Sequence, residues 1–513
     1  MNRMEPARKP NLGASPTSTR KSFHPDPHFV ALALALLLAG CAVGPDFRAP
    51  AAPATDTIIA LPAETVAADV PTGDAQRFLA GRPVPAQWWR FFANAELDRR
   101  VERALAHSPT VASAQAALRQ AQEGVNAARG PLLPSLDAGI GATRQNGLAA
   151  GQPGASPFTV HHASASVGYT LDLFGGVRRG IEAQSALADL AAYQLEGTYL
   201  SLAANVATTS FLEASLREQI AATAEIVEVY RRQYDLVARQ NEIGAKSQAD
   251  VLLAQSQVAT ASAQLPALRK ALAQTQTQLA VYVGALPSEA EFAALDLDEI
   301  SLPQDIPLSL PSTLVRERPD IRIAEAQLHQ ASAQVGIATA NLFPTITLSG
   351  SYGSQAARSG DLFGSGSEAW SLGLNLLQPV FRGGSLRAQK RAAEAGLERA
   401  AADYRTTVLT AFQNVADSLR ALELDAEGLR AQAAAVEATA ASLALVDVQF
   451  REGAASQLQV LDATRQYQQA RIALIQARAA RLTDTAALYA ALGGGWRGDP
   501  NSTTATVVDT ASN

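Results

Sequence analysis

The sequence predicts a mostly α-helical chain with a membrane β part, built from a duplicated unit. Three observations support this fold class. Residues 114–134 align without gaps on residues 324–344, so a unit of about 200 residues occurs twice. Each copy holds a long proline-free stretch rich in Ala, Leu, Gln, Glu and Arg, all good helix formers. Each copy also holds two short segments in which apolar and polar residues alternate, which is typical of β-strands.

The first forty residues are typical of an export signal. Five Lys or Arg residues precede an apolar run from Phe29 to Leu38, which is too short to cross a bilayer as a helix. Leu38-Ala39-Gly40-Cys41 resembles the bacterial lipobox, in which the Cys thiol receives a diacylglyceryl group and the Cys becomes the first residue of the mature chain. We therefore expect residues 1–40 to be cleaved and Cys41 to be lipidated, anchoring the chain in outer-membrane lipid. A plain signal peptide with a chance cysteine is the alternative.

Composition excludes several classes of protein. Cys41 is the only cysteine, so neither an internal disulfide nor a thiolate metal cluster can form. The formal charge is −6, and removal of residues 1–40 makes it −9, so a nucleic-acid partner is not expected. No other segment approaches eighteen consecutive apolar residues, and any further membrane crossing should therefore use strands.

Each copy predicts one very long helix and a return helix. Residues 176–243 and 384–452 contain no proline, and each stretch would form a rod of roughly 100 Å at 1.5 Å per residue. Glycines stand where these rods should end, and serines that can cap a return helix follow them. These residues are Gly244 and Ser247 in the first copy and Gly453 and Ser456 in the second.

Shorter helices are expected before each rod. They span residues 109–129 and 319–340, and each is entered through a proline, which is favoured in the first helical turn.

Between the short helix and the rod, the hydrophobic period changes from 3.6 to 2. Strands are predicted in residues 136–143 and 162–173, and in the second copy around residues 345–352 and 370–376. Strands of about ten residues with one apolar and one polar face are typical of a membrane barrel with a wet interior. Four strands cannot close on themselves, and an open edge in lipid is costly. Three copies would supply twelve strands, so we expect a homotrimer.

Several motifs together resemble the TolC-like outer membrane factors, and more narrowly their OprM/NodT lipoprotein branch. They are the lipobox followed by Cys41-Ala42-Val43-Gly44-Pro45-Asp46-Phe47, the segment Gln87-Trp88-Trp89-Arg90-Phe91-Phe92, Arg318-Pro319-Asp320-Ile321, and Leu342-Phe343-Pro344-Thr345 before a strand. The resemblance covers the chain from Cys41 to about Gly495. It implies a 12-stranded trimeric β-barrel in the outer membrane, continued by a long α-helical periplasmic tunnel.

The resemblance also implies a function and partners. Such a channel is the passive exit duct of a tripartite efflux system for drugs or other small toxic compounds. A periplasmic adaptor would join it to an inner-membrane transporter, of the resistance-nodulation-division type on this reading. Two alternatives are a channel for type I protein secretion, with the same fold, and a lipid-anchored coiled-coil spacer. The amphipathic strands speak against the spacer, and the lipobox and paired tryptophans favour efflux over protein secretion.

The repeat and the resemblance together divide the chain into six parts. These are a signal peptide with lipobox (1–40), an N-terminal anchor and equatorial segment (41–95), a first repeat (96–286), an equatorial connector (287–315), a second repeat (316–495) and a tail (496–513).

The second hairpin is the predicted periplasmic gate. Leu458, Asp462 and Arg465 stand at i, i+4 and i+7 and share one helix face, and the resemblance places them at the constriction of the tunnel. Three leucines would form an apolar plug, and three aspartates would repel one another unless matched by arginines. Asp250 in the first copy is a candidate partner that locks the tip. Phe450 and Ala455 stand where the TolC-type lock has a Tyr and an Arg, so this chain departs from that lock. The alternative for Asp462 and Arg465 is a plain exposed helical pair.

No enzyme is predicted. Motifs for metalloprotease, hydrolase and P-loop chemistry are missing, and Gly244-Ala245-Lys246-Ser247 lacks the adjacent Gly-Lys of a P-loop. His161 and His162 are neighbours on a strand and point to opposite faces, so a metal site and a cofactor are not expected.

Overall fold

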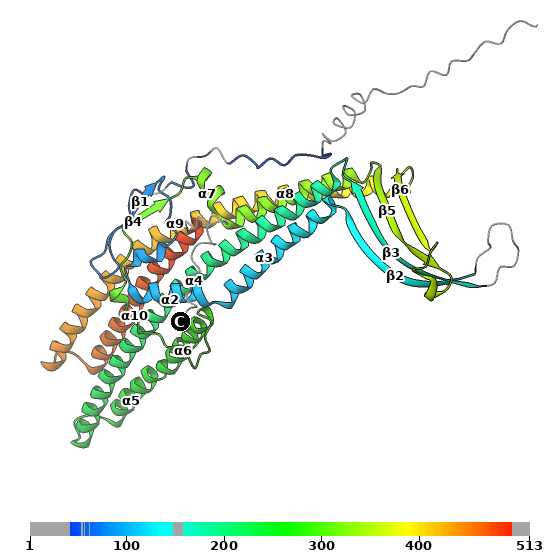
Figure 1. Ribbon diagram of the computed structural model, residues 1–513. Helices are drawn as coiled ribbons and strands as arrows, with labels where there is room; N and C mark the ends of the chain where they lie inside the picture. Colours follow the sequence, from blue (N-terminus) through cyan, green and yellow to red (C-terminus); the bar gives the residue numbers. More distant parts are fainter. Residues whose placement is uncertain (1–41, 53–54, 56, 61, 147–156, 495–513) are drawn as a thin grey trace, which may run out of the picture.

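The computed structural model describes residues 42–52, 55, 57–60, 62–146 and 157–494. Cys41, the signal segment 1–40 and the tail 496–513 lie outside these residues. Figure 1 shows an elongated molecule with a curved sheet at one end, long helices leading away from it, and helical hairpins at the opposite end. The sheet and the hairpins are therefore joined by the same helices.

The strands and the main helices follow one another in the same order in both copies, whereas the short 3₁₀ helices η2 and η4 lie at different places. The first copy contains α2 (Ala95–His107), α3 (Pro109–Arg129), η2 (Gly130–Leu132), β2 (Ser135–Gln145), β3 (Phe158–Leu171), α4 (Gly176–Glu242), α5 (Gln248–Ser262) and α6 (Gln264–Tyr282). The second contains α7 (Pro311–Glu317), α8 (Pro319–Ala340), β5 (Thr345–Ala356), η4 (Ser359–Asp361), β6 (Glu368–Leu377), α9 (Ser385–Arg451) and α10 (Gln457–Ala491). Outside the copies lie β1 (Arg77–Ala80), η1 (Trp88–Phe92), η3 (Leu297–Glu299) and β4 (Asp305–Leu308).

The predicted rods are confirmed. α4 and α9 have 67 residues each, and both begin after a glycine with positive φ, Gly175 at 76° and Gly384 at 81°. Positive φ is a conformation that glycine adopts without steric cost. The return helices begin where expected, because Ser247 and Ser456 each form a capping box at the start of α5 and α10. The short helices α3 and α8 also have their predicted bounds.

The two return helices differ, which the sequence analysis did not predict. α10 runs unbroken for 35 residues, whereas its counterpart is divided into α5 and α6 at Ala263. Pro266 explains the break, since it lacks the N–H that would donate to the carbonyl of Ser262 in a continuous helix.

The four predicted strands form one antiparallel sheet in the described residues, in the order β2-β3-β5-β6. The central pair joins the two copies, with Leu171 opposite Ile346 and His161 opposite Ala356. β3 begins at Phe158, four residues before its predicted start, and the other strands are also slightly longer than predicted. The periodic core of each strand was therefore located correctly, and its ends were not.

The main hydrophobic core lies around the middle of the long helices. There the parallel pair β1 and β4 and the short helix η1 pack on α4, α9 and α10. Trp88 stacks on Tyr489 with ring centroids 5.6 Å apart, and Phe92 contacts Phe211 at 4.9 Å. The segment from β1 to η1 is therefore fixed to the helices by aromatic packing.

One described helix, α9, is long and apolar enough to cross a membrane by length and composition, and the stretch that meets this test is not buried within the chain. α9 packs along α10 and α8. We therefore assign α9 to the group of long helices that leads away from the sheet. Its exposed apolar stretch requires contact with another molecule there.

Candidate functional site

The sheet has one apolar and one polar face. Its apolar side chains are widely exposed, with Trp370 at 77% and Tyr352 at 61%, and these two lie directly opposite each other on β5 and β6. The others are Leu136, Ile140, Val167, Leu348, Leu372, Leu374 and Leu376. A soluble sheet would cover such a surface, whereas lipid solvates it.

The other face of the sheet carries hydroxyl groups. Ser351 and Ser371 form a hydrogen bond of 2.8 Å between their Oγ atoms, and Thr170 and Thr347 one of 3.3 Å. The outer strands β2 and β6 have no further strand partner within the described ranges. A sheet with a lipid-compatible face, a wet face and two open edges is a fragment of a larger barrel.

The residues that follow Cys41 are fixed where the sheet meets the helices. The N–H of Val43 donates to the carbonyl of Phe174 at 3.1 Å, directly after β3. A Cβ placed on Gly175 would come within 2.6 Å of Ala42, and one on Gly44 within 2.4 Å of the backbone of Gly336. The packing therefore requires glycine at both contacts and brings the start of the described chain to the membrane end of the helices.

A charged cluster holds the same segment. The buried guanidinium of Arg179 donates to Asp46 at 2.7 Å and to Glu182 at 2.6 Å, and Phe47 stacks on His329 with centroids 4.3 Å apart. The N-terminal segment is thus bound to α4 and α8 together.

The structure places the predicted gate residues at the hairpin tip. Leu458 is 65% exposed, and Asp462 pairs with Arg465 at 2.5 Å and accepts from Gln466 at 2.6 Å. The hydrogen bond from Arg465 is the main cause that holds the pKa of Asp462 below its ordinary value. The three side chains lie together on α10 as predicted, and their role at a constriction stays a prediction.

Asp250 lies at the tip of the other hairpin. Its carboxylate accepts from the N–H and the hydroxyl of Ser247, at 3.0 and 2.8 Å, and these bonds lower its pKa. In the single chain this carboxylate therefore caps α5. Its predicted role in locking the tip stays a prediction.

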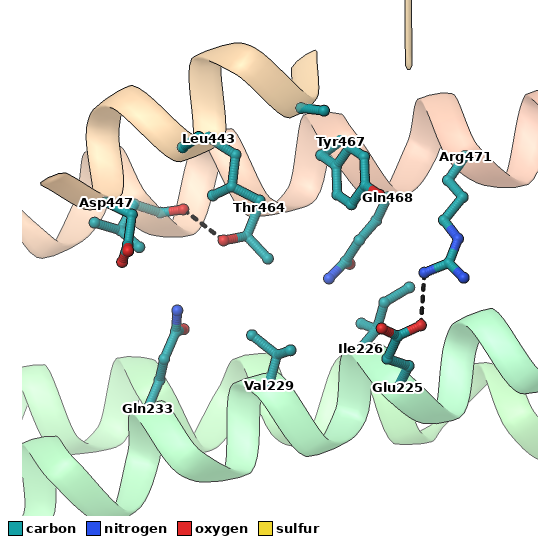
Figure 2. Close-up of a pocket in the computed structure, with 13 residues that line it drawn as sticks. Glu225, Ile226, Val229, Gln233, Leu443, Asp447, Thr464, Tyr467, Gln468 and Arg471 are labelled. Atoms are coloured by element: carbon teal, nitrogen blue, oxygen red, sulfur yellow. Dashed lines mark hydrogen bonds and ion pairs between the residues drawn. The ribbon is translucent and has the colours of Figure 1, made fainter. Parts of the chain in front are cut away.

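A cavity of about 440 Å³ separates the two hairpins above their tips. Figure 2 shows α4 on one side and α9 and α10 on the other, with Val229, Leu443 and Tyr467 facing the gap. One ion pair crosses it, between Glu225 and Arg471 at 2.6 Å. The hairpins therefore touch less closely here than at the aromatic core.

The model of the family described as "Outer membrane efflux protein" matches residues 101–285 and 310–494, which is most of the chain. The chain belongs to the outer membrane efflux protein family.

Named relatives and solved structures agree with the family match. The chain is 35% identical over 422 residues to the pyoverdine export outer membrane protein OpmQ of Pseudomonas aeruginosa, covering 80% of this chain and 88% of the relative. It is 33% identical over 472 residues to the antibiotic efflux pump outer membrane protein ArpC of Pseudomonas putida, covering 90% and 94%. The solved channel OprN superimposes with a TM-score of 0.78 at 28% identity, covering 89% of this chain and all of that one. The open state of MtrE from Neisseria gonorrhoeae gives 0.76 at 27%, covering 89% and 98%.

These findings confirm the predicted family, fold class and location. The efflux protein is an outer-membrane channel subunit that extends into the periplasm, and it is not an enzyme. Its sheet supplies part of a barrel that only several subunits can close.

Sequence analysis missed two buried charged clusters in the efflux protein. In the first, Arg100 on α2 donates to Glu213 on α4 at 2.7 Å and to the carbonyl of Ala293 at 2.7 Å. Glu213 is fully buried and also accepts from Arg217 at 2.7 Å and Gln276 at 3.2 Å. Burial raises the pKa of Glu213, but the charge of Arg100 and these donors outweigh it, so the pKa stays below its ordinary value.

The second cluster fixes the segment before β1 to α10. Arg481 is fully buried and donates to the carbonyls of Thr72 at 3.0 Å and Asp74 at 2.6 Å, and to the hydroxyl of Thr65 at 3.1 Å. Burial lowers its pKa to about 10. Nearby, Asp425 on α9 has one carboxylate oxygen that is buried without a donor.

Asp425 should make the stability of the efflux protein pH-dependent. Burial, followed by the adjacent carboxyl of Asp484, raises the pKa of Asp425 to about 7. The folded chain thus holds a proton that the unfolded chain releases near pH 4. As the pH rises from about 4 to about 7, the free energy of unfolding therefore falls, because the buried carboxyl must ionise. Asp425→Asn, which cannot ionise, should therefore be more stable than the wild type at pH 8, by on the order of 1–2 kcal/mol after allowance for partial exposure, with little gain at pH 4.

Thermal unfolding of the detergent-solubilised protein at pH 4, 6 and 8 measures this difference. Asp447→Asn is a suitable control, because Asp447 lies exposed on the same helix. A constant difference between Asp425→Asn and wild type at all three pH values would contradict the raised pKa of Asp425.

Proposed function

We propose that the chain forms, as a homotrimer, the passive exit duct of a tripartite efflux pump for drugs or other small toxic compounds. The observation that carries the proposal is the direct continuation of the amphipathic sheet into two 67-residue helices. Three chains would surround the axis with twelve helical segments. At 8–10 Å between helix axes this gives a bore of roughly 25 Å, wide enough for small molecules to pass without a binding step.

The partners follow from the chemistry that the chain lacks. No nucleotide or catalytic motif is found in the sequence, so the energy for transport must come from another protein. We infer an inner-membrane transporter of the resistance-nodulation-division type and a periplasmic adaptor that joins it to the hairpins. The names of ArpC, an antibiotic efflux component, and TtgC, a toluene efflux component, support small toxic compounds as cargo. OpmQ, named for pyoverdine export, also supports small molecules rather than unfolded proteins.

Transport in cells tests the proposal. In a host deleted for its own outer-membrane efflux channels, co-expression of this chain with its pump and adaptor should lower the accumulation of a fluorescent dye. It should also raise resistance to several unrelated antibiotics. The matched control carries the same pump and adaptor without the chain. Unchanged dye accumulation with a correctly located trimer, together with secretion of a protein substrate, would favour the type I alternative.

We further propose the six-part division of the chain with boundaries after residues 40, 95, 286, 315 and 495. The equatorial parts, 41–95 and 287–315, contain β1 and β4, whose parallel pairing supports their assignment to one girdle. The tail 496–513 lies outside the described residues.

Lipidation of Cys41 is the remaining part of the proposal. Ala42 packs against Gly175 at the membrane end of α4, so acyl chains on the preceding residue would reach the bilayer without unfolding the segment. Mass spectrometry of the mature N-terminal peptide should show a diacylglyceryl group on Cys41 and a further acyl chain on its amine. Cys41→Ser should remove both modifications. The variant should either keep its signal segment or be cleaved as a secreted protein without a lipid. An unmodified Cys41 thiol in the mature wild-type protein would contradict the anchor.

A further inference from the structure

A groove of about 440 Å³ lies between α8 and the half of α9 that is nearer to the sheet. On the α9 side it is lined by residues without long side chains, Ala393, Gly396 and Ala400. A Cβ built on Gly396 would meet no atom within 4 Å, so the space beside it is open. Both walls belong to one chain, so the shape of the groove does not depend on a second subunit.

Three glutamine side chains form the α8 wall of this groove. Gln327, Gln330 and Gln334 stand at i, i+3 and i+7, so they share one side of the helix. None of the three side-chain amides has a hydrogen-bond partner among the residues that the structure describes. Because each amide offers both donors and an acceptor, this wall can bond to a solute in either sense.

An arginine and an aspartate also line the groove, and they do not pair with each other. Arg399 and Asp403 are one helical turn apart on α9 and both are exposed, yet no ion pair joins them in the described part of the chain. The spacing does not prevent a pair, because Lys390 and Glu394 at the same spacing on α9 lie 3.2 Å apart. Both charges are therefore available to a solute, and a guanidinium is well suited to bind a carboxylate.

The glutamine wall faces away from the N-terminal segment. Phe47 stacks on His329 and Gly44 packs against Gly336, so that segment covers one side of α8, beside which it runs in Figure 1. The three glutamines lie about 100–160° around the helix from His329. Three copies of the N-terminal segment, which continues into β1 and η1, would obstruct a bore of roughly 25 Å, so we place this segment outside the duct. The opposite side of α8, with its glutamines, then lines the inside.

We propose that this groove is a weak binding site in the duct wall for small zwitterionic solutes, which carry a carboxylate and an ammonium group. The carboxylate binds Arg399, the ammonium group binds Asp403, and the glutamine amides bond to the other polar groups of the solute. The groove is open, so much of a bound solute stays in water, and the dissociation constant should be on the order of 1 mM. The inference rests on the efflux duct proposed above and adds a class of cargo that the wall itself recognises.

Filling the groove tests the site itself. Ampicillin, a zwitterion, serves as the probe, and saturation-transfer NMR measures its binding to the detergent-solubilised protein. Gly396→Leu places a side chain in the open space and should weaken binding by about tenfold or more, because the solute loses its room. Gly428→Leu is the matched control, since a Cβ at Gly428 also meets no atom within 4 Å and Gly428 does not line the groove. Both changes replace a glycine inside α9, so neither should weaken the helix.

Charge variants test the recognition. Arg399→Gln should weaken the binding of ampicillin and of benzylpenicillin alike, because both carry the same carboxylate. Asp403→Asn should weaken only ampicillin, because benzylpenicillin lacks the ammonium group. Each loss should raise the dissociation constant by about tenfold, as expected for a charge-assisted hydrogen bond. Arg451→Gln and Asp447→Asn, which change an exposed pair near the hairpin tip, are the controls for charge alone.

The outcomes separate the site from the proposed function. Equal ampicillin binding by Gly396→Leu and Gly428→Leu would overturn the site, even if the chain lowers dye accumulation in cells with its pump and adaptor. An equal loss of both penicillins in Asp403→Asn would overturn the recognition of an ammonium group. Groove-dependent binding by a chain that supports no efflux would instead overturn the proposed function and leave the binding site in place.

Discussion

Leu458→Ala combined with Asp462→Ala should raise the open probability of the channel in planar bilayers by about tenfold or more, a population shift of ~1.4 kcal/mol. The double change removes three apolar side chains and three carboxylates from the proposed constriction. Leu458 is 65% exposed in the single chain, so its apolar surface is available to the other two subunits. Because Asp462 pairs with Arg465, its removal also frees a positive charge at the tip.

Accumulation of bulky antibiotics in cells should increase in parallel, since the open duct admits them from outside. Asp447→Ala is the matched control, because Asp447 forms a similar exposed pair with Arg451 before the turn. Glu225→Ala should have a smaller effect in the same direction, since it breaks the ion pair that crosses the cavity between the hairpins. Unchanged conductance of a correctly assembled Leu458→Ala, Asp462→Ala trimer would exclude these residues from the gate.

Glu213→Ala should lower the free energy of unfolding by about 3–5 kcal/mol, because it leaves the buried guanidinium of Arg100 without its carboxylate. The loss also leaves Arg217 and Gln276 without this acceptor, so it removes the hydrogen bonds through which Glu213 links α4 to α2 and α6. Thermal unfolding of the solubilised trimer, followed by circular dichroism, measures it.

Glu225→Ala on the same helix controls for the loss of a carboxylate as such. Its ion pair with Arg471 is largely exposed and should contribute at most about 1 kcal/mol. Glu213→Gln should fall between the two, since an amide still accepts hydrogen bonds without a charge. Equal losses for Glu213→Ala and Glu225→Ala would show that the buried cluster does not stabilise the fold.

The sequence predicted the parts of this fold that depend on periodicity. The long helices, the capping serines and the alternating strands each repeat a local pattern over many residues, and each pattern occurs twice. The ends of the strands were less accurate, because residues such as Phe158 extend a strand by pairing with its neighbour and not by their own alternation.

The buried clusters depend on contacts between distant segments, so local patterns could not reveal them. Arg100 and Glu213 lie on separate helices, and Arg481 bonds to a segment that is about 400 residues away. One signal was present nevertheless. Val206, Ser210 and Glu213 stand at i, i+4 and i+7, so a carboxylate occupies the apolar face of α4 and must find a partner there.

The break between α5 and α6 gives the two hairpins unequal stiffness. Both descend from one ancestral unit, but Pro266 removes a backbone hydrogen bond from the first and nothing interrupts α10 in the second. The first hairpin can therefore bend at Ala263 while its lower turn stays helical, whereas the second resists bending along its whole length. Pro266 thus leaves two arms of common origin with different stiffness, one compliant and one rigid.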